Sequence, residues 1–79
     1  MNRQKQYEIL VEIVAQARLL SATSDNDEVS LNTHKIKPYG VNAAVALGYS
    51  DVKFKSDSIK RYQELLEQNK EKGVGKNGN

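Results

Sequence analysis

The sequence predicts an all-α fold, a small domain of three to four helices, and three observations support this. Residues 4–21 are all acceptable helix formers, and their polar residues Glu8, Glu12 and Gln16 recur every four positions. Apolar residues recur at helical spacing again between residues 59 and 66. The chain has 79 residues, of which 38% are hydrophobic and 28% charged, close to the size at which one core is only marginally stabilising. We therefore expect one domain.

We expect residues 1–69 to form this helical domain and residues 70–79 to form a disordered tail. The tail segment is rich in Gly, Asn and Lys and has almost no apolar content. Such a composition cannot bury enough apolar surface to offset the entropy of ordering the chain.

The first predicted helix has an apolar face wider than half of its circumference. At about 100° per residue, this face collects Tyr7, Ile9, Leu10, Val11, Ile13, Val14, Ala17 and Leu20. One interpretation is that the helix is simply the central core helix of the domain. The other is that part of the face packs on a second copy or on a partner protein. For this second interpretation the predicted interface residues are Tyr7, Leu10, Val11 and Val14.

The segment after this helix predicts a loop. Residues 21–30 are rich in turn and capping residues and include the acidic Asp25, Asp27 and Glu28. A calcium loop needs a glycine and a distal glutamate that are missing here, so we expect no metal site. Residues 31–37 fit either a strand or a helix, and a short helix or irregular turn before Pro38 is favoured.

Two further helices are expected after Pro38. Asn42 is predicted to cap a short, buried, apolar helix at residues 43–47, which Gly48 ends in a left-handed conformation. Ser56 is predicted to cap the last helix, with Asp57 in its first turn.

The composition excludes several function classes. The chain has no cysteine and a single histidine, His34, so it has neither disulfides nor a thiolate zinc site, and no catalytic motif is present. We expect a protein that is not an enzyme and has no cofactor. The apolar run near the amino terminus is too short and too charged to cross a membrane, which predicts a cytoplasmic protein.

Charge is distributed unevenly along the chain. Residues 35–62 contain six basic residues against two acidic ones, a local charge of +4, whereas residues 23–34 carry a charge of −3. A basic segment of this kind is typical of a surface that meets a polyanion.

The most informative motif lies within this basic segment. Ala44, Leu47, Gly48, Tyr49 and Phe54 occupy the positions of the small, apolar and turn residues of a helix-turn-helix, although the later apolar position falls on Asp57 or Ser58. Residues 40–62 resemble the small-helix and Gly-Tyr-Ser segment of DNA-binding domains in phage terminase small subunits and some bacterial transcription regulators. The resemblance implies a DNA-binding surface made of Ser50, Asp51, Lys53, Lys55, Ser56, Lys60 and Arg61. The alternative is a corner that only closes the core, with its lysines in solvent.

Two functional hypotheses follow. The first is a small DNA-binding regulatory protein of the phage or mobile-element type, dimeric through its amino-terminal helix. The alternative is a protein–protein interaction module, such as an inhibitor, antirepressor or adaptor, that binds a regulatory protein through the apolar face of that helix. The expected partners are therefore DNA, a second copy or a regulatory protein.

Overall fold

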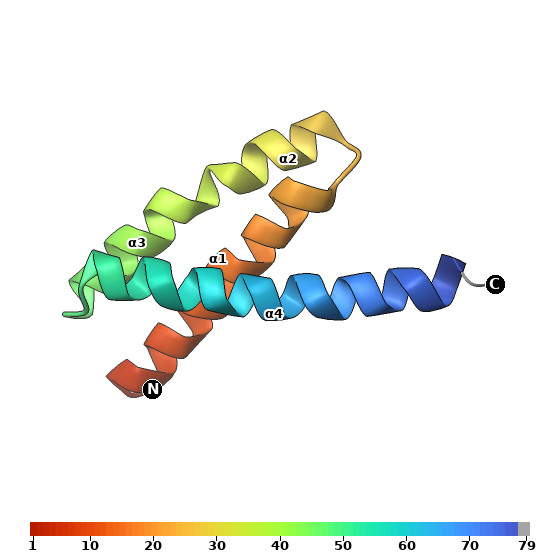
Figure 1. Ribbon diagram of the computed structural model, residues 1–79. Helices are drawn as coiled ribbons and strands as arrows, with labels where there is room; N and C mark the ends of the chain where they lie inside the picture. Colours follow the sequence, from red (N-terminus) through yellow and green to blue (C-terminus); the bar gives the residue numbers. More distant parts are fainter. Residues whose placement is uncertain (78–79) are drawn as a thin grey trace.

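The computed structural model contains four α-helices and confirms the all-α expectation. It describes the backbone of residues 1–77 and the side chains of residues 1–70. The helices are α1 (Arg3–Thr23), α2 (Asp27–His34), α3 (Ile36–Ala46) and α4 (Asp51–Asn77), and residues 1–77 contain no strand. Helices α2 and α3 run back alongside α1, and α4 crosses α1 (Figure 1). Helix α1 packs against all three of the others and is the centre of the fold.

Helix α1 agrees closely with the helix predicted at residues 4–21. The side chain of Asn2 caps it by accepting a hydrogen bond from the Lys5 backbone N–H at 2.7 Å. The helix ends at Thr23, after which the Ser24 N–H donates to the carbonyl of Leu20.

The prediction of a loop at residues 21–30 was wrong for most of this segment. Only residues 24–26 lie outside the helices, because α2 begins at Asp27. The Asn26 side chain accepts a hydrogen bond from the Val29 N–H at 3.1 Å, and Asp27 and Glu28 stand in the first turn, where negative charge suits the helix dipole. The polar residues that resemble a loop in sequence are therefore a helix cap, and residues 31–34 continue in α2.

The break between α2 and α3 falls at Lys35, three residues before Pro38, and the chain continues as a helix beyond it. Proline has no N–H, so it cannot donate to the carbonyl four residues earlier, and the chain is interrupted at Lys35. Pro38 itself lies in the first turn of α3, where a proline is tolerated. Helix α3 thus begins at Ile36, and the prediction that Asn42 caps a helix at residues 43–47 was wrong because Asn42 lies inside α3.

A tight corner joins α3 to α4. Gly48 has φ of +95°, a left-handed conformation that favours glycine, as the sequence predicts. The Ser50 hydroxyl oxygen accepts a hydrogen bond from the Lys53 N–H at 3.0 Å, so Ser50 caps α4. The prediction that Ser56 caps the last helix was wrong, because Ser56 already lies in the second turn. Helix α4 continues to Asn77. The side chains after Lys70 lie outside the described residues. The disordered tail expected at residues 70–79 therefore stays a prediction.

The core lies where α1, α3 and α4 meet. Its buried side chains are Tyr7, Val14, Ala44 and Phe54. Small residues permit this close packing: a Cβ at Gly40 would overlap Cγ2 of Val14, and Ser58 of α4 is fully buried. Only one side of the expected apolar helix at residues 43–47 is buried, because Val45 is half exposed.

Candidate functional site

Two of the predicted DNA-binding cations form ion pairs within the chain. The ammonium of Lys53 donates to Asp57 Oδ2 at 2.8 Å. The guanidinium of Arg61 bridges Glu12 of α1 at 2.7 Å and Glu64 at 3.1 Å, and these two carboxylates raise the pKa of Arg61. Arg61 thus joins α4 to α1, whereas Lys53 is paired within α4 and lies 5.2 Å from the ring centre of Tyr7 on α1. Both cations are therefore less available to an external anion than the sequence suggests.

Tyr7 belongs to the same α1–α4 contact and not to an exposed interface. Its ring stacks on Tyr49 and meets the edge of Phe54, and its hydroxyl donates to Asp57 Oδ2 at 2.6 Å. Burial, followed by the hydrogen bond to Asp57, raises the pKa of Tyr7. The prediction of Tyr7 at a partner interface was wrong for this reason.

The other three predicted interface residues also face the core. Val14 is fully buried, and Leu10 and Val11 pack against the core cluster. The part of the wide apolar face of α1 that remains at the surface is the opposite half, with Ile9, Ile13 and Leu20. The prediction of an interface through Val14 was therefore wrong, because α3 and α4 cover that half of the helix.

The remaining predicted DNA-binding residues divide between the cap and the outer face of α4. Ser50 caps the helix and Asp51 accepts a hydrogen bond from the Val52 N–H. Lys55, Ser56 and Lys60 are exposed. At about 100° per residue, the two lysines stand at opposite edges of the outer face. Val52, Ser56, Ile59 and Gln63 lie between them, all exposed.

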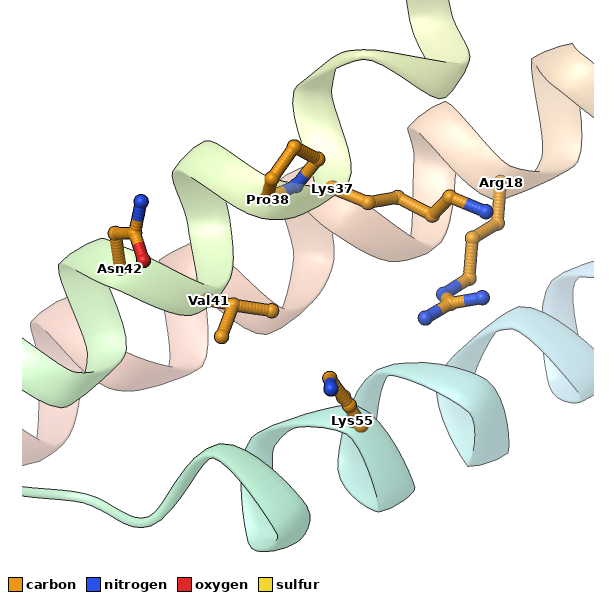
Figure 2. A pocket seen from close by; sticks show the side chains of 6 residues that line it. All are labelled: Arg18, Lys37, Pro38, Val41, Asn42 and Lys55. Carbon is orange, nitrogen blue, oxygen red and sulfur yellow. The ribbon is translucent and has the colours of Figure 1, made fainter.

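A cationic pocket lies beside this outer face. The pocket has a volume of about 380 Å³ and is lined by Arg18, Lys37, Pro38, Val41, Asn42 and Lys55. Figure 2 shows Arg18 coming from α1, Lys37 from α3 and Lys55 from α4, with their side chains directed toward the space between the three helices. No carboxylate lines it, and within residues 1–70 none of the three cations forms an ion pair. Three helices thus bring three positive charges together without a neutralising group.

Two of the three cations in this pocket, Arg18 and Lys37, are partly withdrawn from water. Burial lowers the pKa of Arg18. Burial lowers the pKa of Lys37 as well, and the nearby Arg18 charge adds to this. The Nε of Arg18 is buried without a hydrogen-bond partner. A buried cationic donor without a partner is costly, and an anion in the pocket would offset the positive charge that Arg18 and Lys37 place there.

Neither Arg18 nor Lys37 belongs to the surface predicted from the sequence. The position of Arg18 could have been noticed in the sequence. It follows Val11 by seven residues and Val14 by four, so it places a charge on the inward-facing side of α1. Lys37 gives no such signal, since its position depends on α3 beginning before Pro38.

Comparison of the chain with protein-family models, with curated proteins and with solved structures gives no match. In the part of the chain that the structure describes, no helix is both long and apolar enough to cross a membrane. The same residues contain no group of three or more His, Cys, Asp or Glu side chains placed to hold a metal ion.

Proposed function

We propose that this protein binds duplex DNA with the outer face of the first three turns of α4. The observation that carries the proposal is the corner at Gly48, from which α4 departs with an exposed face flanked by Lys55 and Lys60. Within residues 1–70 neither lysine forms an ion pair. Ala44 and Phe54, two positions of the helix-turn-helix pattern, are fully buried at this corner, which supports the same assignment.

The chemistry of this face suits a DNA groove. Lysines at the two edges neutralise phosphates on either side of the groove and set the position of the helix. Between them, Ser56 offers a hydroxyl to base edges, and Val52 and Ile59 offer apolar contact to thymine methyl groups. Lys53 and Arg61 are paired with carboxylates of this chain, so they are left out of the proposed face.

A charge placed in the middle of this face tests the proposal. We expect Ser56→Glu to weaken binding to duplex DNA at least about tenfold, because the carboxylate would face phosphates and base acceptors. Fluorescence anisotropy with mixed-sequence duplex at low and moderate salt measures the affinity. Gln68→Glu is the matched control, since it adds the same charge to an exposed position on the other side of α4. The proposal fails if the unmodified protein does not bind duplex at low salt, or if both variants lose affinity equally.

We also propose that a second copy covers the exposed half of α1. Ile9, Ile13 and Leu20 line a groove of about 420 Å³ together with Ile36. Ile9 also lines a neighbouring apolar groove of about 440 Å³ that reaches Leu47. A chain this small gains stability by burying such a surface, and two corners related by two-fold symmetry would contact two successive turns of DNA.

The oligomeric state tests this second proposal. We expect the protein to have twice the chain mass of 8.9 kDa in sedimentation equilibrium, and Ile13→Asp to reduce it to a monomer with unchanged helical circular dichroism. Val52→Asp is the control, because Val52 is 72% exposed but lies on α4, away from the groove. A monomeric unmodified protein at high concentration, or an Ile13→Asp variant that remains dimeric, would contradict the proposal.

A further inference from the structure

We infer that the pocket formed by Arg18, Lys37 and Lys55 is a binding site for a phosphate group. The inference rests on the proposed function in one respect, since we assign the group to the DNA backbone next to the face of α4. Neither Arg18 nor Lys37 lies in the segment that resembles a helix-turn-helix, so this site extends the predicted surface onto α1 and α3.

The three cations of the pocket are arranged differently from the paired cations elsewhere in the chain. Packing that serves only stability places basic side chains beside carboxylates, as in the pairs of Lys53 with Asp57 and of Arg61 with Glu12. Arg18, Lys37 and Lys55 instead line one open pocket, and no carboxylate of residues 1–70 lines it with them. Like charges held together in this way repel, and an anion removes the repulsion.

The side chains that line the pocket can donate several hydrogen bonds. Arg18 has a planar fork of donors that matches two oxygens of one phosphate, and its buried Nε has no hydrogen-bond partner among the residues that the structure describes. The two lysines add point charges from the opposite walls, and the side-chain amide of Asn42 adds a donor. The lining therefore offers donors from three helices to a tetrahedral anion.

The pocket lies next to the exposed face of α4. Lys55 belongs both to this pocket and to one edge of the exposed face of α4. A duplex that meets this face therefore brings its backbone to the mouth of the pocket on the Lys55 side. The amino-terminal turn of α3, which contains Lys37, lies across the pocket from Lys55 (Figure 2).

The experiment has two arms and uses the full chain with two variants. Lys37→Gln removes one charge from the pocket and leaves the outer face of α4 intact, and Lys5→Gln removes the same charge from an exposed position on α1 outside the pocket. In the first arm, inorganic phosphate replaces chloride at constant ionic strength while thermal unfolding is followed. We expect phosphate to raise the Tm of the unmodified protein and of Lys5→Gln, and to have little effect on Lys37→Gln.

In the second arm, duplex affinity is measured against salt concentration. We expect Lys37→Gln to lower the affinity about threefold to tenfold at moderate salt and to reduce the slope of log K against log salt by about 0.9, the effect of one lost phosphate contact. Lys5→Gln should change neither quantity.

The outcomes separate the two proposals. Duplex binding with an unchanged slope in Lys37→Gln overturns the phosphate site and leaves the proposed function standing. Stabilisation by phosphate that depends on Lys37, without any duplex binding, supports the site with a free phosphate compound as its ligand and overturns the DNA function. Equal effects of Lys37→Gln and Lys5→Gln in both arms overturn the site as well, because general charge then explains the binding.

Discussion

Phe54→Ala is expected to destabilise the protein by about 3–5 kcal/mol, the usual cost of replacing a buried phenylalanine by alanine. Phe54 is fully buried, its ring meets that of Tyr7 at a centroid distance of 5.7 Å, and it lies beside Gly40 of α3. One side chain thus joins all three helices of the core. A domain of this length has a total stability of roughly 4–12 kcal/mol, so the substitution should remove from about a quarter to all of that stability.

Urea denaturation followed by circular dichroism measures this loss. Val52→Ala is the matched control, since Val52 lies two residues earlier on α4 and is 72% exposed. We expect that control to change the free energy of unfolding by no more than about 0.5 kcal/mol. A loss below about 1 kcal/mol in Phe54→Ala would show that the three helices do not meet on this ring.

Asp57→Ala is expected to cost about 1–3 kcal/mol, because the Tyr7 hydroxyl would lose its hydrogen-bond acceptor in a largely buried position. Asp57→Asn is the matched variant, since an amide oxygen can still accept from Tyr7 while the charge that attracts Lys53 is lost. We expect Asp57→Asn to lose clearly less stability than Asp57→Ala at neutral pH. Equal losses in urea denaturation would contradict the role of the hydroxyl hydrogen bond.

The same carboxylate predicts a loss of stability in acid. The hydrogen bond from Lys53, and then that from Tyr7, lowers the pKa of Asp57, and Arg61 followed by Gln16 lowers the pKa of Glu12. The contribution of a group with a lowered folded pKa is present above its unfolded value of about 4 and is lost as the pH falls through the folded value. We therefore expect the free energy of unfolding to fall below about pH 4, and to fall less steeply in Asp57→Asn.

The local features of the chain were predictable from sequence. Short-range effects decide them: the helix-forming run of residues 4–21 and the need for a left-handed residue at position 48 both act over a few neighbours. Mistakes arose where one residue type serves two purposes. Asn26 and Asp27 fit a loop as well as a helix cap, and Asn42 fits a cap as well as a helix interior.

What only the tertiary structure decided is which surfaces face inward and which charges are neutralised. Helix α1 has apolar residues on both halves, and the packing of α3 and α4 determines that Val14 is buried while Ile13 is exposed. Lys53 and Lys55 are equivalent in sequence, yet a rotation of about 200° along the helix places one beside Asp57 and the other in the cationic pocket. Glu12, which pairs with Arg61, lies far from it in the sequence. Arg18 and Lys37, which share the pocket with Lys55, are also distant from it in the sequence. Long-range packing therefore selects the candidate site, whereas local preferences select only the helices that carry it.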